Sequence, residues 1–335
     1  MKLSVALAVM ISCLAVSFTA RSELYEVREP HYQMGTILDI TVWHSDPKAA
    51  SAIIRRCVRE VHRLDKILSD YDRESSLSLF NRQGGKGKVR IDTDLHRLLT
   101  MANDFSLRTS GYFDVTVGPL VALWREAGEK GTPPELRALS QTLELVGFQK
   151  LKLHRTGEAE LLNAGMKIDL GGIGKGFAVD RVVKILHEVG VERALVNFGG
   201  SSFYALGSPP HEASWTIGVK GISEQLVGVV HLKDRGLSTS GSMGRYWEIG
   251  GVRYGHLINP KSGLPATRPR SATAVAKTAT DAEALTKPLV LLGRQGMAMI
   301  KDISQTESWL ISESGEIYFS DGFVSATRFQ RIEDR

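Results

Sequence analysis

A glycine-rich stretch at residues 166–181 (MKIDLGGIGKGFAVDR) carries residue types that could bind a charged ligand. Its four glycines would let the backbone approach a ligand closely, and the helix predicted to follow would present free N–H groups to an anion. Asp169 and Lys175 flank the turn, a pair that suits a phosphate ester and its metal. A P-loop would need glycine in place of Asp169 and Ser or Thr in place of Gly176, and the spacing does not fit G-x-G-x-x-G. A nucleotide site remains open, and so does a turn that only packs a strand at residues 166–170 against a helix.

A histidine and a run of hydroxyl side chains are the next candidates. His256 opens the sequence HLINPKSG, whose Asn-Pro and Ser-Gly pairs are turn signals, so it is predicted to stand at a strand end, where side chains reach pockets. Residues 238–242 (STSGS) are predicted to form a turn whose hydroxyls suit phosphate oxygens. A structural histidine and a turn that caps itself are the alternatives.

Aromatic and acidic residues add two further candidates. Residues 111–116 (GYFDVT) place an aromatic ring and a carboxylate at a predicted helix exit, where Phe113 could equally anchor a loop in the core. Asp281 and Glu283 could help bind Mg²⁺, which prefers oxygen ligands, or they could be solvated acids at a helix start. The sequence has no G-x-S-x-G, no H-E-x-x-H and no Cys/His pair for nucleophilic catalysis.

Hydrophobic periodicity places these candidates on a mixture of strands and helices. Alternation over residues 36–43 predicts the second strand of a hairpin at residues 26–43, and an apolar stripe predicts a helix at residues 49–68. There is no internal repeat and no regular βαβ cadence, so the sequence predicts an α+β fold. Further helices are predicted at residues 92–107, 278–293 except Pro288, and 295–303, and further strands at residues 194–198, 215–219, 227–232, 245–249, 271–277, 309–312 and 317–320.

The first 22 residues have the composition of a targeting segment. An uncharged, mostly apolar run between Lys2 and Arg21 predicts a secretory signal peptide at residues 1–22, followed by one domain at residues 23–335. A weak lipobox leaves lipidation of Cys13 open. We therefore expect Sec export to the periplasm, with inner-membrane association only through an uncleaved or lipidated N-terminus.

Charge and cysteine content exclude several classes of function. Removing Lys2 and Arg21 with the signal peptide leaves 40 of the 42 basic residues against 37 acidic ones, a net charge of +3. There is no polybasic run, so binding to nucleic acid or to a membrane surface is not expected. Cys57 would be the single remaining cysteine, which excludes a disulfide framework and a cysteine metal site.

The order of these motifs resembles the ApbE family, the FAD:protein FMN transferases, over nearly all of residues 23–335. Residues 169–180 resemble the family's D-L-G-x-I-x-K-G-x-x-x-D element, and residues 256–263 its H-x-I-x-P-x-x-G turn. The remaining family motifs resemble Met34-Gly35-Thr36, the series Tyr71, Ser75, Ser78 and Asn81, and residues 111–120, 195–200 and 238–241.

The resemblance implies a single large, T-fold-like α+β domain with mixed sheets and packed helices that binds FAD. It implies a transferase that uses Mg²⁺ to move FMN from FAD to a threonine hydroxyl of a partner protein, with release of AMP. The expected partner is an exported or membrane-bound redox subunit with a Ser/Thr-Gly-Ala-Thr-like acceptor motif. Carried over residue by residue, the family's site makes His256 the catalytic residue and lines the FAD site with Met34, Tyr71, Tyr112, Phe113, Asp114, Asp169, Lys175 and Ile258.

The metal site implied by the resemblance departs from the family pattern. Gly172 would offer its carbonyl to Mg²⁺, but the helix that usually reads A-D-A-L-x-T-A-L-x-x-L-G has Glu283 at the aspartate and Lys287 at the threonine, preceded by Thr286. Glutamate keeps a carboxylate on a longer arm, whereas an ammonium group repels Mg²⁺. Glu283 could instead pair with Lys287 four residues on, and Lys287 could brace the diphosphate directly.

Two interpretations remain open at this point. In the first, the protein transfers FMN with an altered or single-metal site, because Asp169, Lys175 and His256 are all present. In the second, it is an FAD-binding relative with impaired transfer, which serves as a flavin carrier, a scaffold or a weak FAD pyrophosphatase.

Overall fold

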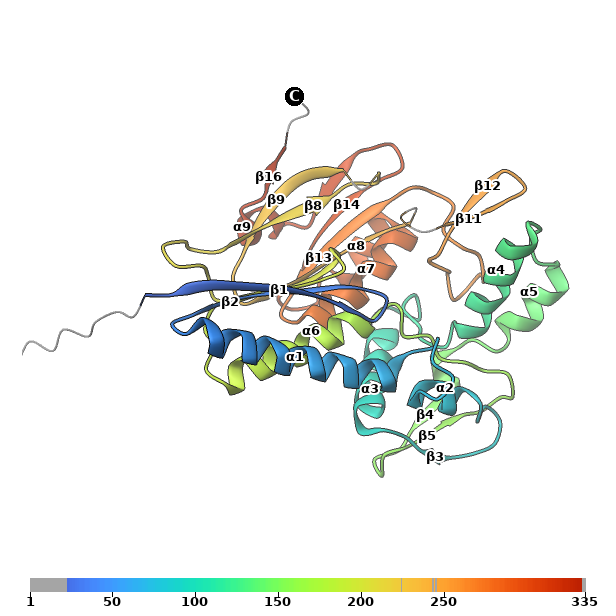
Figure 1. Ribbon diagram of the computed structural model, residues 1–335. Coiled ribbons are helices and arrows are strands. Elements are labelled where there is room, and N and C mark those ends of the chain that lie inside the picture. Colours follow the sequence, from blue (N-terminus) through green and yellow to red (C-terminus); the bar gives the residue numbers. More distant parts are fainter. Residues whose placement is uncertain (1–22, 224, 243, 245, 333–335) are drawn as a thin grey trace, which may run out of the picture.

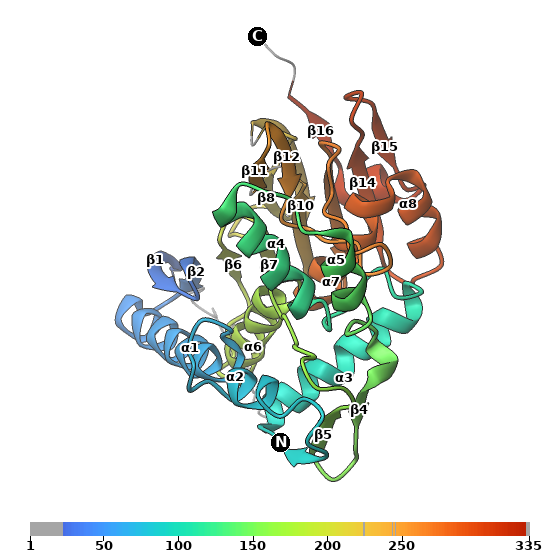
Figure 2. The same cartoon turned by 90° about the vertical axis from the view of Figure 1, so that its right-hand side faces the viewer.

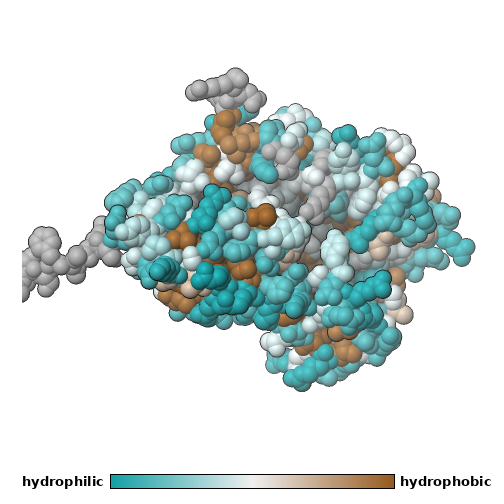
Figure 3. Space-filling view, in the orientation of Figure 1, coloured by the Kyte–Doolittle hydropathy of each residue, from teal (hydrophilic) through white to brown (hydrophobic). Residues whose placement is uncertain are grey.

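The computed structural model of the chain describes residues 23–332 except residues 224, 243 and 245. The predicted signal peptide at residues 1–22 and the weak lipobox at Cys13 lie outside the described residues. No helix of the described part is long and apolar enough to cross a membrane. On the face drawn in Figure 3, hydrophobic residues lie in small groups among hydrophilic ones.

An eight-stranded sheet forms the central layer, in the order β1-β2-β6-β7-β10-β13-β14-β15 (Figure 1). Every neighbouring pair in it is antiparallel, as expected for an α+β fold without βαβ crossovers. The strands are β1 (Tyr25–Gln33), β2 (Thr36–His44), β6 (Ala194–Phe198), β7 (Ser202–Leu206), β10 (Arg235–Gly241), β13 (Ser271–Ala276), β14 (Glu307–Ile311) and β15 (Ile317–Phe319).

The two faces of this sheet are covered by different layers (Figure 1). Helices α1 (Pro47–Leu68), α6 (Gly174–Glu188) and α7 (Ala279–Leu292) cover one face, and a small sheet in the order β16-β9-β8 covers the other. Side chains alternate accordingly along the strands: Ala274 belongs to the core on the helical side, and the next residue, Val275, to the core on the opposite side. The small sheet consists of β8 (Trp215–Lys220), β9 (Leu226–Leu232) and β16 (Gln330–Arg331).

The remaining elements flank this centre, and α4 and α5 stand toward the viewer in Figure 2. Trp124 of α4 and Ile249 of the hairpin β11–β12 share a third, smaller core. The flanking helices are α2 (Ser76–Asn81), α3 (Thr93–Arg108), α4 (Gly118–Lys130), α5 (Leu136–Leu143), a 3₁₀ turn (Phe148–Lys150), α8 (Arg294–Ile300) and α9 (Phe323–Thr327), and the flanking strands are β3 (Val89–Arg90), β4 (Leu151–Leu153), β5 (Glu158–Leu161), β11 (Tyr246–Ile249) and β12 (Val252–Gly255).

Helices α6 and α7 meet at an unusually close contact. A Cβ atom at Gly176 would lie 2.5 Å from the carbonyl oxygen of Ala279, so only glycine lets the two backbones approach this far. The carboxylate of Asp180 accepts hydrogen bonds from the N–H groups of Ala279 (2.8 Å) and Thr280 (2.9 Å), which satisfies free donors at the start of α7. Burial raises the pKa of Asp180 to about 6. The start of α6 is therefore held beside the first turns of α7.

Most of the predicted elements are confirmed, with small shifts at their ends. The predicted hairpin corresponds to β1 and β2, the helix predicted at residues 278–293 runs through Pro288, and His256 directly follows β12 as expected. Two predictions are wrong. Residues 238–241 lie in the central strand β10 and not in a turn, and residues 166–170 form only one bridge, between Lys167 and Val117, and not a strand.

Candidate functional site

The glycine-rich turn is held in place by side chains and backbone from two other segments. The Asn81 side chain makes the two hydrogen bonds with Ile168 that a neighbouring strand would make. Its Nδ2 donates to the carbonyl of Ile168 (2.9 Å), and its Oδ1 accepts from the N–H of Ile168 (2.7 Å). The N–H of Asp169 donates to the carbonyl of Val115 (2.8 Å). These bonds fix the extended chain that enters the turn, although it belongs to no sheet.

Asp169 itself bends back onto the turn. Its Oδ1 accepts a hydrogen bond from the N–H of Gly171 (2.8 Å). Burial raises the pKa of Asp169; the nearby carboxylate of Asp70 adds to this shift, and the guanidinium of Arg125 opposes it. The carboxylate of Asp169 therefore helps to shape the turn.

Glu283 of α7 occupies the start of α6, where an anion was predicted to bind. Its Oε2 accepts a hydrogen bond from the N–H of Gly176 (2.6 Å), and its Oε1 lies 3.3 Å from the Nζ of Lys175. The Glu283 side chain is only 2% exposed, whereas that of Lys175 is 30% exposed. A carboxylate at a helix N-terminus is favourable because of the helix dipole. Among the described residues, the ion pair of Glu283 is thus with Lys175, and not with Lys287.

Lys287 lies against the turn from the other side. A Cβ atom at Gly172 would be 3.3 Å from its Cε, so the lysine stem packs on this glycine. The Nζ donates to the carbonyl of Glu283 (3.0 Å) and to the hydroxyls of Ser240 (3.1 Å) and Thr286 (3.1 Å). Burial lowers the pKa of Lys287 to about 8; Glu283 opposes this shift and Lys175 adds to it. The side chain still carries its charge at neutral pH.

The aromatic segment at residues 111–116 borders the same turn. Phe113 is buried, its ring is 5.9 Å from that of Phe105, and a Cβ atom at Gly172 would lie 3.5 Å from its Cε2. Asp114 accepts hydrogen bonds from the N–H groups of Thr116 (2.8 Å) and Phe148 (2.8 Å), and burial raises its pKa. In the described structure, Phe113 is thus a core anchor beside the turn and Asp114 fixes the loop.

Two aromatic rings of the predicted site are paired with cations. The Nζ of Lys261 lies 4.3 Å from the ring centre of Tyr112, and the guanidinium of Arg125 lies 5.6 Å from that of Tyr71. Tyr71 is 79% exposed. The sequence prediction did not single out Lys261 or Arg125, although Lys261 lies within the turn that begins at His256.

The other predicted residues lie on neighbouring loops. His256 is exposed and begins the segment after β12, while Ile258 is buried in the same small core as Trp124. The Nε1 of Trp124 donates to the carbonyl of Gly263 (2.8 Å) and so fixes this turn. Met34 occupies the turn between β1 and β2 with a positive φ of 46°, which few residues other than glycine adopt.

Comparisons with known proteins agree with this arrangement. The sequence pattern described as the ApbE family matches residues 34–310. The chain belongs to the ApbE family. It is 29% identical to the FAD:protein FMN transferase of Treponema pallidum (strain Nichols), covering 96% of this chain and 94% of that one. It is 30% identical to the FAD:protein FMN transferase of Haemophilus influenzae, covering 80% and 79%.

Solved structures of the ApbE family have the same fold. The flavin transferase ApbE from Vibrio cholerae superposes with a TM-score of 0.79 at 25% identity, covering 90% of this chain and 99% of that one. The ApbE protein from Thermotoga maritima gives a TM-score of 0.78 at 29% identity, covering 90% and 98%. The predicted family, the α+β fold and the assignment to transferase enzymes are therefore confirmed.

The residues at the metal position that the family resemblance predicts do not fit a divalent cation. Glu283 directs its carboxylate to Lys175 and Gly176, and the oxygens of Ser240 and Thr286 already accept from an ammonium group. At 4 Å and an effective dielectric constant of about 20, two like unit charges repel by about 4 kcal/mol before screening, and a divalent ion feels about twice that, so an ammonium group at this position disfavours a metal. Within residues 23–332, apart from the three omitted positions, there is no cluster of three His, Cys, Asp or Glu side chains that could hold a metal.

The structure thus brings together one part of the predicted site. Contacts join the glycine turn to α7 and to the aromatic segment, through the residues Phe113, Gly172, Lys175, Glu283, Thr286 and Lys287. The other lining residues make contacts outside this cluster: Ile258 packs in the small core with Trp124, and Met34 packs against the main core. The Tyr71 ring pairs with Arg125 and the Tyr112 ring with Lys261. Lys175 and Lys287 are the two cationic groups of this cluster.

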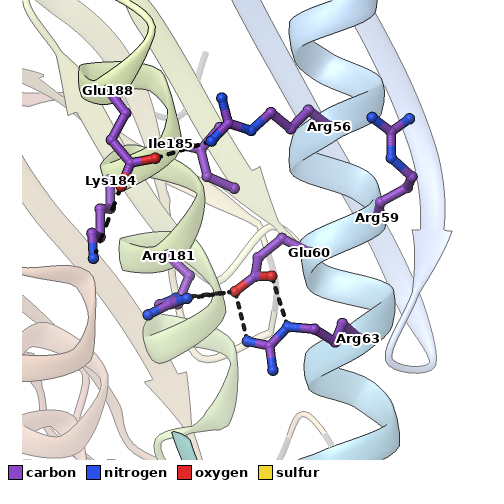
Figure 4. Close-up of a pocket in the computed structure, with 8 residues that line it drawn as sticks. All are labelled: Arg56, Arg59, Glu60, Arg63, Arg181, Lys184, Ile185 and Glu188. Atoms are coloured by element: carbon purple, nitrogen blue, oxygen red, sulfur yellow. Dashed lines mark hydrogen bonds and ion pairs between the residues drawn. The ribbon is translucent and has the colours of Figure 1, made fainter.

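A hollow of about 350 Å³ lies elsewhere, between α1 and α6 (Figure 4). Glu60 stands at its centre and bonds to Arg63 and Arg181, and these arginines lower its pKa to about 2. The hollow contains none of the predicted site residues. The ion pairs Arg56–Glu188 and Arg181–Glu60 join the two helices across the hollow.

Proposed function

We propose that this chain is an FAD:protein FMN transferase that moves FMN from FAD to a threonine hydroxyl of an acceptor protein. The proposal rests on two ammonium groups, those of Lys175 and Lys287, at a glycine-rich turn in a chain related over most of its length to enzymes of that name. A diphosphate ester is the part of FAD that such a cationic turn suits best.

The proposed reaction is a displacement at phosphorus. The threonine oxygen forms a bond to the FMN phosphorus, and the bond from this phosphorus to the bridging oxygen breaks, so that AMP leaves with that oxygen and its electron pair. The hydroxyl proton passes to His256, which we propose as the general base or as an orienting group for the phosphate. Positioning and charge neutralisation are the main needs of such a transfer.

The predicted flavin-lining residues keep the roles implied by the ApbE resemblance. Tyr71 offers an exposed ring for stacking, and Tyr112 offers another beside Lys261. We propose that Met34, Phe113, Asp114, Asp169, Lys175 and Ile258 complete the FAD site, with Phe113 and Asp114 acting by shaping the turn. The predicted dependence on Mg²⁺ stays a prediction. The oxygen atoms around Lys287 already accept hydrogen bonds from its ammonium group, which argues against a metal beside Gly172.

A second function is favoured by one observation, the replacement of the usual family Asp and Thr by Glu283 and Lys287. An FAD-binding protein with impaired transfer would keep the flavin bound, as a carrier or scaffold, or would pass it slowly to water as a weak FAD pyrophosphatase. The transferase and the pyrophosphatase differ in the group that attacks phosphorus. In the transferase it is the threonine hydroxyl of the acceptor protein, and in the pyrophosphatase it is water.

The proposed partner is an exported or membrane-bound redox subunit with a Ser/Thr-Gly-Ala-Thr-like motif, and the proposed location is the periplasm. The test is to incubate the purified protein with FAD and an acceptor domain carrying this motif, and to measure the acceptor by intact-protein mass spectrometry. We expect the mass of one added FMN, lost when the acceptor threonine is changed to alanine. An unmodified acceptor with accumulation of free FMN and AMP would instead support the pyrophosphatase.

A further inference from the structure

The position on α7 that faces the glycine turn is held by a lysine whose stem packs directly on Gly172. The distance from a Cβ atom at Gly172 to the Lys287 Cγ would be 3.8 Å, and to its Cε 3.3 Å. Lys287 is only 9% exposed, so its charge is fixed inside the fold and not carried on a mobile surface arm.

The oxygen atoms around the Lys287 Nζ are those expected of a cation site. They comprise one main-chain carbonyl, from Glu283, and two hydroxyls, from Ser240 and Thr286, all at 3.0 to 3.1 Å. Such neutral oxygens are also ligands that a hard metal ion takes. Three acceptors match the three hydrogens of an ammonium group, so Lys287 has a complete set of partners. The oxygens therefore already hold a cation.

The Glu283 carboxylate, which stands at the predicted metal-ligand position, is turned away from these oxygens. Glu283 is bound by the N–H of Gly176 at 2.6 Å and lies beside the ammonium of Lys175 at 3.3 Å. Gly176 can lie this close because it has no side chain to separate α6 from α7. The three groups where α7 meets the turn, Lys175, Lys287 and Glu283, comprise two ammonium groups and one carboxylate, so this side of the turn keeps a positive charge without any added ion.

We propose that the Lys287 ammonium is the resident cation of the flavin site and takes the place of a divalent metal at the glycine turn. The inference rests on the proposed function, because the Lys287 charge would act on the diphosphate of FAD. Lys287 would stabilise the negative charge that gathers on the bridging oxygen as AMP leaves. It would act as a fixed charge and would form and break no covalent bond.

The first test measures metal binding without any flavin, so that it does not depend on the proposed function. The free Mn²⁺ signal is followed by electron paramagnetic resonance as Mn²⁺ is added to the metal-stripped protein. We expect no saturable micromolar site in the wild type. We expect such a site in the double variant Glu283→Asp/Lys287→Thr, which restores the usual family ligands. Its matched control, Glu283→Asp/Lys175→Thr, also loses one lysine near the turn but should gain no Mn²⁺ site.

The second test measures FAD affinity by flavin fluorescence in Mg²⁺ and in EDTA. The wild type should bind equally in both, within about twofold, whereas the double variant should need Mg²⁺ for tight binding and lose about tenfold or more in EDTA. A saturable Mn²⁺ site in the wild type, or a tenfold loss of wild-type affinity in EDTA, would overturn the proposal. The proposal would also be overturned if the double variant Glu283→Asp/Lys287→Thr folds but shows no saturable Mn²⁺ site. If wild type binds no FAD at all, the proposed function fails, and the Mn²⁺ titration still decides the role of Lys287.

Discussion

The Nζ of Lys175 lies 3.3 Å from the Oε1 of Glu283, and this ion pair joins the first turn of α6 to α7. The same carboxylate accepts from the N–H of Gly176, so one side chain neutralises a lysine and caps a helix. Lys287 is left to bind carbonyl and hydroxyl oxygens and to face Gly172. Lys175 is therefore paired with a carboxylate, whereas among the described residues the charge of Lys287 is bound only by neutral oxygen atoms.

Gly176→Ala should destabilise the protein strongly. Its Cβ would lie 2.5 Å from the carbonyl oxygen of Ala279, so α6 and α7 would have to separate, at a cost of about 2 to 3 kcal/mol. Gly174→Ala is the matched control in the same turn of α6, since its nearest neighbour would be Leu170 Cβ at 4.0 Å. Urea unfolding should show the control unchanged or more stable by up to about 1 kcal/mol. Equal stability of the two variants would contradict the close contact.

Tyr71→Ala should weaken FAD binding without changing stability. Tyr71 is 79% exposed, so loss of its ring should alter the free energy of unfolding by less than about 0.5 kcal/mol. Loss of aromatic stacking should lower FAD affinity about tenfold, measured by flavin fluorescence quenching. Tyr25→Ala, at the opposite end of β1 from Met34, should leave affinity unchanged. Unaltered binding by Tyr71→Ala would place the flavin elsewhere.

His256→Asn should separate binding from transfer. FAD affinity should stay within about threefold of wild type, while single-turnover labelling of the acceptor should slow by about 100-fold or more, the usual contribution of a general base. His44→Asn, on the far end of β2, serves as the control and should transfer at the wild-type rate. Transfer by His256→Asn at the wild-type rate would remove this residue from the mechanism.

Lys287 should impose a pH dependence on stability. Burial lowers its pKa from 10.5 to about 8, so between these values the unfolded chain binds more protons at this residue than the folded chain does. The free energy of unfolding should therefore rise by about 3 kcal/mol from pH 8 to pH 10.5 through this group, and stay flat below pH 8. Lys287→Met should remove that rise.

The comparison with wild type isolates this contribution from the other groups that titrate at high pH. Lys184→Met provides a matched control, because the Lys184 side chain on α6 is 58% exposed. Urea unfolding at pH 8 and pH 10.5 should give Lys184→Met the wild-type difference. The same difference in Lys287→Met would mean that Lys287 titrates as an ordinary lysine.

Local patterns in the sequence were sufficient for the elements with strong periodicity. The apolar stripe of α1 and the alternation in β2 place both elements within a few residues of their observed ends. The hydroxyls and the glycine of residues 238–242 predict a turn, whereas the strand conformation of β10 comes from pairing with β7 and β13. Such pairing over long distances in the sequence leaves no local signal.

The side-chain contacts of the candidate site also depend on residues far apart in the sequence, so local patterns do not predict them. The family resemblance predicts that Lys287 stands at a metal-ligand position and leaves open what it contacts. The direction of the Glu283 carboxylate depends on Gly176, which lies 107 residues earlier and approaches only after α6 has docked. α4 was missed although its boundary signals are present, with Pro119 at its start and Gly131 in the left-handed conformation at its end.

The way Asn81 holds the turn has a consequence for folding kinetics. Its two hydrogen bonds to Ile168 span 87 residues, and the bonds of Glu283 and Asp180 between α6 and α7 span about 100. Closing such long loops costs chain entropy before any contact is gained, and folds rich in distant contacts form slowly. The glycine-rich turn should thus be among the last parts of the chain to acquire native structure, and if FAD binds there as proposed, it should bind only to molecules that have completed folding.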